Sequence, residues 1–150
     1  MGYIWQGFGT TLIVTLIAAL IGLVLGFIVA VVKIAAMYNK WMKIPSFICG
    51  IYTTIIRGTP VALQLFLMVF AILVIRGFSP YAAILTFGIN SGAYVSENIR
   101  AGIMSVDNGQ MEAGRSLGMP WGATMVKIVF PQAIKNVVPA IGNEMIALLK

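Results

Sequence analysis

Hydrophobic residues occupy long uninterrupted segments of this sequence. No charged residue occurs from Met1 to Val32, and the stretch from about Phe8 to Val32 is mostly apolar. Because a helix needs about 20 apolar residues to cross a bilayer, this stretch predicts a retained membrane-spanning helix. A cleaved signal peptide is disfavoured, since the first six residues carry no basic side chain and a signal core has only about 7–15 apolar residues. Gly22 and Gly26 lie four residues apart, which would let a second helix approach closely.

The second apolar region is divided by a short break. Residues Pro45–Ile56 and Val61–Ile75 are mostly apolar, and Arg57-Gly58-Thr59-Pro60 separates them. As a helix the second piece extends only about 22 Å, whereas the bilayer core is about 30 Å thick. We therefore expect a kinked helix or a helix–break–helix, with Pro60 in the first turn of the second piece. A short turn is expected at residues 76–80.

The third predicted span, about Pro80–Ile103, carries polar side chains along one face. On a helix, Asn90, Tyr94 and Glu97 fall within about 60° of one another. Polar groups within a span usually face a bundle interior or a water-filled cavity. Asn90, Tyr94, Glu97 and Arg100 are therefore candidates for a substrate pathway. The alternative for Glu97 is an ion pair with Arg100, three residues further on, near the end of the span.

Residues 105–129 are the most polar part of the sequence. Asp107 can cap a helix, with Gln110 as the second half of a capping box. Gly118 and Pro120 are typical of a helix end, so we expect a short helix at about 108–117. A second short helix would place four apolar side chains on one face before Pro131: Trp121, Met125, Ile128 and Val129. This pattern predicts a helix–turn–helix at the membrane surface. Residues 133–149 then begin another apolar segment, interrupted by Lys135, Asn143 and Glu144.

The composition excludes an ordinary soluble domain. Hydrophobic residues make up 60% of the chain and charged residues 9%, whereas soluble domains carry about 25% charged residues. The net charge of +6 is scattered between apolar segments, so we expect no nucleic-acid binding. The connection that holds Lys33, Lys40 and Lys43 has no acidic residue. By the positive-inside rule it faces the cytoplasm, which places the N-terminus outside.

The sequence offers little catalytic chemistry. It has no histidine, one cysteine and four acidic residues, so we expect no catalytic triad, no metal site and no bound cofactor. It also lacks the glycine-rich phosphate loop GxxxxGK[ST]. We therefore expect that the chain is not an enzyme and that any ATP it depends on is hydrolysed by another subunit. Cys49 is expected to be a small residue packed in an apolar stretch rather than a reactive thiol.

The polar segment resembles a known motif. It reads Glu112-Ala113-Gly114, three residues, Gly118, nine residues, and then Ile128-Val129-Phe130-Pro131, which is similar to the EAA loop of bacterial ABC importer permeases. An amphipathic connector without special function would explain a helix–turn–helix but not this spacing. Other stretches resemble the polar-amino-acid uptake family and extend the likeness over nearly the whole chain: Arg57-Gly58-Thr59-Pro60 with Gln64-Leu65-Phe66, Ala93–Ile103 and Asn143–Lys150.

The resemblance implies an all-α polytopic transmembrane helical bundle with a short cytoplasmic coupling helix. Residues 1–150 would form a single permease domain with about four spans, truncated at its C-terminal end, where a fifth span would follow. Two permease subunits, identical or homologous, would form the pore in a bacterial inner membrane. A dimeric ABC ATPase would use ATP and Mg²⁺ beneath them, and an extracytoplasmic binding protein would deliver a polar amino acid. An ion-coupled secondary transporter, or a non-transporting fragment or interaction subunit, is the alternative.

The resemblance also implies roles for particular residues. The helix at about 108–117 would be the coupling helix, and the residues that contact or serve the ATPase would be Glu112, Ala113, Gly114, Gly118 and Pro131. The alternative for Glu112 is an intrahelical ion pair with Arg115. A gate or subunit interface is expected at Arg57, Gly58, Thr59 and Pro60, and the alternative for Arg57 is an anchor at the cytoplasmic side of the membrane. The EAA loop would lie in the cytoplasm and the N-terminus outside.

Overall fold

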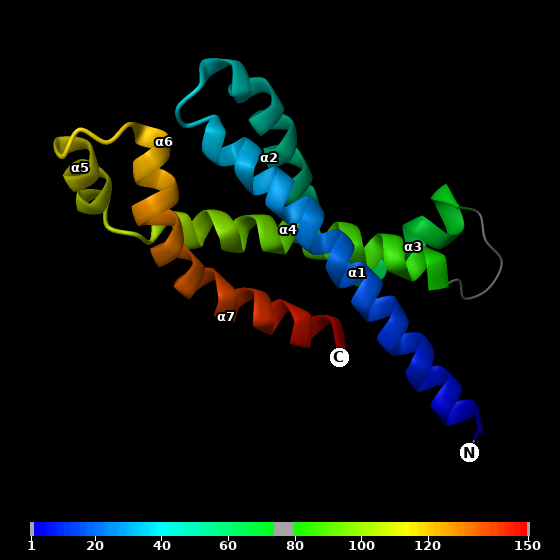
Figure 1. Ribbon diagram of the computed structural model, residues 1–150. Coiled ribbons are helices and arrows are strands. Elements are labelled where there is room, and N and C mark those ends of the chain that lie inside the picture. The colour runs from blue at the N-terminus through cyan, green and yellow to red at the C-terminus, as the bar shows by residue number, and fades with distance from the viewer. Residues whose placement is uncertain (1, 74–79, 150) are drawn as a thin grey trace.

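The computed structural model describes residues 2–73 and 80–149, and these residues are almost entirely helical (Figure 1). They form no β-strand, which confirms the all-α prediction for this part of the chain. The elements in order are α1 (Gly2–Ala35), the 3₁₀ turn η1 (Lys40–Met42), α2 (Lys43–Gly58), α3 (Val61–Leu67), the π-helix η2 (Met68–Ile72), α4 (Pro80–Met104), α5 (Asn108–Ser116), α6 (Trp121–Thr124), the π-helix η3 (Met125–Val129) and α7 (Phe130–Leu149).

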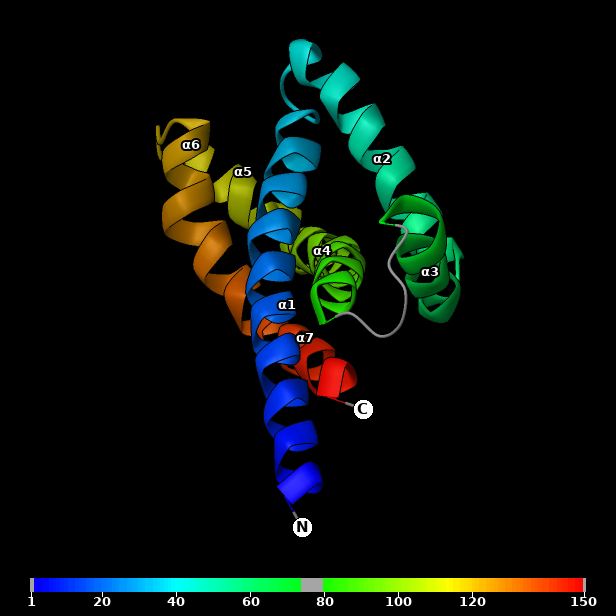
Figure 2. The same ribbon diagram turned by 90° about the vertical axis from the view of Figure 1, so that its right-hand side faces the viewer.

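Helices α1 and α4 cross at the centre of the molecule (Figures 1 and 2). The crossing is close because glycines face it from both helices. A Cβ atom on Gly22 would lie 2.6 Å from Ser91 Oγ, and one on Gly92 would lie 3.0 Å from Leu25 Cβ. Gly26 likewise faces Val95. The predicted close approach at Gly22 and Gly26 is thus confirmed. Within a membrane the hydrophobic effect does not hold helices together, so small residues stabilise the crossing by letting the two backbones pack closely.

The apolar core lies where α1, α4 and α7 meet. Ala30, Val95, Ile99 and Val137 form one buried cluster. Gly102 of α4 lies directly against the Val137 side chain, so it leaves the space that α7 needs. Helix α7 is therefore held against α4 along its first half, and its second half runs on toward the break between α2 and α3.

The predicted helix–break–helix is confirmed. Helices α2 and α3 meet at an angle of 106°, and Thr59 between them is extended, with φ −117° and ψ 142°. Pro60 is the N-cap of α3, so it precedes the first turn rather than lying within it. The Gln64 amide donates hydrogen bonds to the carbonyl oxygens of Ile56 and Thr59, at 2.7 and 3.1 Å. These bonds satisfy polar backbone groups that the break leaves without helical partners. Residues 76–79 of the expected turn lie outside the described residues.

The short polar helix is found where the sequence predicts it, as α5. The Asp107 side chain caps it by accepting a hydrogen bond from the Gly109 backbone N–H, at 2.6 Å. The expected capping box is wrong, because the Gln110 side-chain oxygen instead accepts a hydrogen bond from Gln132. Gly118 follows the helix with φ +80°. Its N–H donates to Arg115 O and that of Met119 to Gly114 O, which is a Schellman end.

The expected second short helix does not end before Pro131. Helix α6 continues through η3 into α7. Pro131 has no N–H to bond the carbonyl four residues earlier, and just before it the Phe130 N–H bonds Met125 O in a π turn. The added residue in this turn lets the helix pass the proline. The predicted apolar face is confirmed, because its four side chains are buried or half-buried. The Trp121 ring lies 4.2 Å from the Tyr38 ring and joins α6 to the turn that follows α1.

Length and composition identify few clear membrane spans. Among residues 2–73 and 80–149, one helix, Tyr3–Ala35, is apolar enough to cross a membrane by itself, and the bent pair α2–α3 would be a second. Helices α4 and α7 contain 25 and 20 residues, so they are long enough but more polar. The estimate of about four spans stays a prediction. The N-terminus lies at the end of the molecule opposite α5 and α6, and the α1–α2 connection lies at their end (Figures 1 and 2).

Candidate functional site

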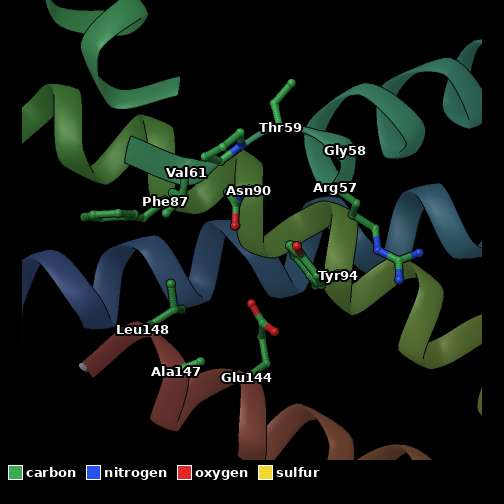
Figure 3. Close-up of a pocket in the computed structure, with 11 residues that line it drawn as sticks. Arg57, Gly58, Thr59, Val61, Phe87, Asn90, Tyr94, Glu144, Ala147 and Leu148 are labelled. Carbon is green, nitrogen blue, oxygen red and sulfur yellow. The ribbon is translucent and has the colours of Figure 1, made fainter. Parts of the chain in front are cut away.

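A cavity of about 690 Å³ lies between the α2–α3 break, the middle of α4 and the end of α7 (Figure 3). Its volume falls in the range of small-molecule sites. It brings together two groups that the sequence predicted separately, the polar face of α4 and the Arg57–Pro60 break. The lining residues are Arg57, Gly58, Thr59, Pro60, Val61, Phe87, Asn90, Tyr94, Glu144, Ala147 and Leu148.

Asn90 and Tyr94 line the cavity one helical turn apart on α4. The Asn90 amide nitrogen donates a hydrogen bond to Gln64 Oε1 at 3.1 Å. This bond orients the side chain so that its oxygen points into the space between α4 and α7 (Figure 3). Gln64 is itself held by the carbonyl groups at the helix break. The break and the α4 face are therefore connected by a hydrogen-bonded path that fixes a free acceptor in the cavity.

Arg57 reaches the cavity from the last turn of α2. Its guanidinium carbon lies 5.2 Å from the centre of the Tyr94 ring, within the range of a cation–π contact. The contact holds the guanidinium beside α4 while its N–H groups remain available as donors. Among the described residues, the structure shows no ion pair for Arg57. A positive charge therefore stands at one side of the cavity.

Glu144 is the cavity residue that sequence reasoning missed as part of the site. Its carboxylate points from α7 toward Tyr94 (Figure 3). No basic group of residues 2–73 and 80–149 lies within ion-pair distance of it. The signal was present in the sequence, since an acidic residue inside an apolar segment often faces a polar cavity. What the sequence could not show was that α7 folds back so that Glu144 faces Asn90 and Tyr94.

Glu97 and Arg100 do not line this cavity. The Glu97 carboxylate pairs with Lys33 Nζ at 2.5 Å and with Arg100 Nε at 2.9 Å. Lys33 also donates to the Thr53 hydroxyl at 2.7 Å, so the cluster joins α1, α2 and α4. The structure thus shows the ion pair that was the alternative for Glu97. Lys33 was not predicted as the partner of Glu97. A lysine at the end of a span is already explained by the positive-inside rule, so the sequence offered no reason to look for an ion pair.

We expect Glu97→Gln to destabilise the protein by about 1–3 kcal/mol, since it leaves two partly buried cations close together without a carboxylate between them. The measurement is thermal unfolding in detergent, with Glu112→Gln as a control that removes an exposed carboxylate outside any ion pair. An unchanged unfolding temperature combined with an altered preference among amino acids would instead assign Glu97 to the substrate pathway.

The EAA-like segment separates into exposed and packed residues. Glu112 and Ala113 are exposed on α5, whereas Gly114 is buried and lies against the side chains of Thr124 and Ile128. Gly114 therefore positions α5 against α6 and η3. Glu112 forms no ion pair with Arg115, although both residues are described. Pro131 is exposed in the first turn of α7. Of the residues expected to serve the ATPase, Glu112, Ala113, Gly118 and Pro131 are thus exposed and free to contact another protein.

Comparisons with known proteins agree on one kind of protein. A family model described as "Binding-protein-dependent transport system inner membrane component" matches residues 22–150. The chain is 42% identical over 151 residues to the arginine transport system permease protein ArtQ of Bacillus subtilis (strain 168), covering 99% of this chain and 67% of that protein. It is 47% identical over 109 residues to the putative glutamine transport system permease protein GlnP of Rickettsia bellii (strain RML369-C), covering 66% of this chain and 47% of that protein.

A solved structure described as "Crystal structure of an amino acid ABC transporter with histidines" has the same fold. It superposes with a TM-score of 0.81 at 40% sequence identity, covering 93% of this chain and 64% of that chain. The chain thus spans about two thirds or less of the length of these relatives. The likeness includes α4 and α5, the helices that carry the cavity face and the EAA-like motif.

Proposed function

Because the chain belongs to the inner membrane components of binding-protein-dependent transport systems, the permeases of ABC importers, we propose that it forms the translocation pathway of an importer for polar amino acids. Family members are integral inner-membrane permeases and not catalytic subunits, which agrees with the expectation that this chain is not an enzyme. The named substrates of similar proteins, arginine and glutamine, and the histidines of the solved structure support a polar amino acid.

The observation that carries this proposal is the chemistry of the cavity. A free amino acid presents an ammonium and a carboxylate a few ångströms apart. Glu144 can accept hydrogen bonds from the ammonium, and Arg57 can donate to the carboxylate. Asn90 and Tyr94 line the same cavity and supply neutral hydrogen-bonding groups. Both charges stand in one cavity of about 690 Å³, so a zwitterion with a polar side chain fits the site better than an apolar or singly charged solute.

The α5 helix supports coupling to a separate ATPase. It is held by Gly114 against α6 and η3, and η3 continues directly into α7, which carries Glu144. A displacement of α5 by an ATPase would therefore be transmitted along a continuous helix to the cavity. In this proposal a dimeric ATPase uses ATP and Mg²⁺, a second permease subunit completes the pore, and a binding protein delivers the substrate from outside.

The proposed orientation places α5 in the cytoplasm and the N-terminus outside. Lys40 and Lys43 lie at the same end of the molecule as α5 (Figure 2), and basic residues favour the cytoplasmic side. The exposed apolar side chains of α1, which include Ile13, Leu16 and Leu20, would then face lipid or the second permease subunit.

Reconstitution tests the proposal. We expect proteoliposomes that hold the complete permease with its ATPase to accumulate radiolabelled arginine, glutamine or histidine only when ATP and the binding protein are supplied. A protonophore should leave this uptake unchanged, because ATP hydrolysis and not an ion gradient supplies the energy. Accumulation driven by a proton or sodium gradient without ATP would establish the secondary-transporter alternative. A permease that binds its ATPase but transports none of a wide panel of amino acids would contradict the substrate assignment.

A further inference from the structure

A separate pocket lies where α1 ends and α2 begins. It has a volume of about 390 Å³ and is lined by Lys33, Ala36, Met37, Lys43, Ser46 and Phe47. Its walls are the end of α1, the two residues that follow it, and the start of α2. The α1–α2 connection lies at the same end of the molecule as α5 and α6 (Figure 2). None of the residues that line this pocket lies on α5 or lines the proposed substrate cavity.

The pocket has an uncompensated positive charge. The Lys33 ammonium is already paired with Glu97. Lys43, by contrast, is exposed, and within the described parts of the chain it has no carboxylate partner. Lys40 adds a further exposed cation on the adjoining turn η1. The first acidic residue of the whole sequence is Glu97, so no carboxylate from α1, α2 or their connection offsets these charges.

The pocket also offers a neutral donor. Ser46 is half-buried at the pocket wall, and its hydroxyl makes no hydrogen bond to any other described residue. It lies one helical turn after Lys43, so the ammonium and the hydroxyl can approach the same bound group. An anion with several acceptor oxygens, such as a phosphate diester, matches a pair of donors of this kind.

An apolar stripe leads away from the pocket along α2. Its members are largely exposed and recur at intervals of three and four residues, which places them on one helix face: Ile44, Phe47, Ile48, Ile51 and Ile55. Trp41, two residues before Lys43 on η1, is 89% exposed, and tryptophan favours the level of the lipid headgroups. The anion-binding end of the pocket is therefore continuous with a surface suited to hydrocarbon.

We propose that this pocket binds one anionic phospholipid, with its phosphate on Lys43 and Ser46 and its acyl chains along the apolar stripe of α2. Lys40 strengthens the attraction to the negative headgroup. A free phosphate ion would satisfy the donors but leave the stripe uncovered, and a zwitterionic lipid would bring a choline cation close to both lysines. Charge complementarity and the direction of the stripe therefore both favour an anionic lipid.

The test is native mass spectrometry of the complete transporter in mild detergent, titrated with dioleoylphosphatidylglycerol or with dioleoylphosphatidylcholine, which has the same acyl chains. We expect phosphatidylglycerol to be retained at lower concentration, and Lys43→Gln to weaken its binding about fivefold, the effect of one basic residue at a charged membrane surface. Lys127→Gln is the matched control, because it removes an exposed lysine on η3 and should leave binding unchanged.

Three outcomes would overturn the proposal. These are equal retention of the two lipids, an equal loss in the Lys43 and Lys127 variants, and displacement of phosphatidylglycerol by an equimolar concentration of inorganic phosphate. Thermal unfolding of both variants in phosphatidylcholine micelles shows whether either has lost its fold. Ser46→Ala provides a second variant, for which we expect a smaller loss of phosphatidylglycerol binding than for Lys43→Gln. ATP-driven transport in phosphatidylcholine alone is a separate readout, so failure of lipid binding leaves the proposed function intact.

Discussion

Replacement of Glu112 by lysine is expected to abolish ATP-driven uptake while the protein still inserts into the membrane. Glu112 is exposed on α5 and forms no ion pair, so reversal of its charge leaves the described fold intact. At an interface with the ATPase, however, a partner that accommodates a carboxylate would meet an ammonium. Truncation or reversal of a buried interfacial charge costs about 2–5 kcal/mol, or a loss of affinity of about 30-fold or more.

The measurement is uptake into proteoliposomes together with the amount of ATPase that copurifies with the permease. Arg115→Glu, which reverses an exposed charge on the same helix, separates a specific role of Glu112 from a general effect of charge on α5. Wild-type uptake by the Glu112→Lys variant would remove this residue from the coupling interface.

Gly118→Val should also abolish ATP-driven uptake, in this case because it strains the backbone at the end of α5. A Cβ atom on Gly118 would meet nothing within 4 Å, but the residue has φ +80°, a conformation that costs a β-branched residue about 1–2 kcal/mol or more. The Schellman end would open, and α5 would lose its fixed direction relative to α6. Gly122→Val is the matched control, because Gly122 also has open space around it and no positive φ. Equal uptake by the two variants would show that the turn does not matter for coupling.

The local features of this fold could be predicted from local sequence signals. Gly22 and Gly26 indicate a close helix crossing, and the Arg57–Pro60 sequence indicates a break. These predictions succeed because the residues determine the shape of the backbone segment in which they themselves lie. Asp107 and Gly118 mark the ends of α5 for the same reason. The failures arise where a distant residue competes with a local partner. Gln132 takes the side-chain oxygen of Gln110, so the local capping box does not form.

The sequence predicted one part of the candidate site, the polar face of α4, because helical periodicity shows which residues share a face. It could not show which residues of other helices contact that face. Glu97 was open to two interpretations, and the choice depends on Lys33, which lies 64 residues earlier and reaches it only because α1 crosses α4. Glu144 joins the cavity only because the π turn at η3 carries the helix past Pro131 and directs α7 back toward α4. Both contacts depend on the packing of whole helices, which no short motif specifies.

Glu144→Gln is expected to lower the transport efficiency, kcat/KM, by about 10- to 100-fold for amino acids of every side-chain class, because the ammonium that Glu144 receives is common to all of them. A hydrogen bond to a charged group contributes about 1.5–3 kcal/mol, and loss of the carboxylate removes the only acidic acceptor that the described residues bring to the cavity. The substitution preserves the size of the side chain, and Glu144 has no ion-pair partner in the described structure. The fold should therefore be little affected.

The matched control for Glu144→Gln is Asn143→Ala, because Asn143 is exposed on the same helix and does not line the cavity. Asn90→Leu is a second, independent test of the cavity. It removes the amide oxygen that points into the cavity and the hydrogen bond to Gln64. Competition by a panel of amino acids and of matched carboxylates that lack the α-amino group separates the two residues. Because Glu144 receives the ammonium in this proposal, Glu144→Gln should reduce the preference for amino acids over these analogues, whereas Asn90→Leu should weaken the binding of both alike. Kinetics unchanged across the panel in both variants would mean that substrate does not pass through this cavity.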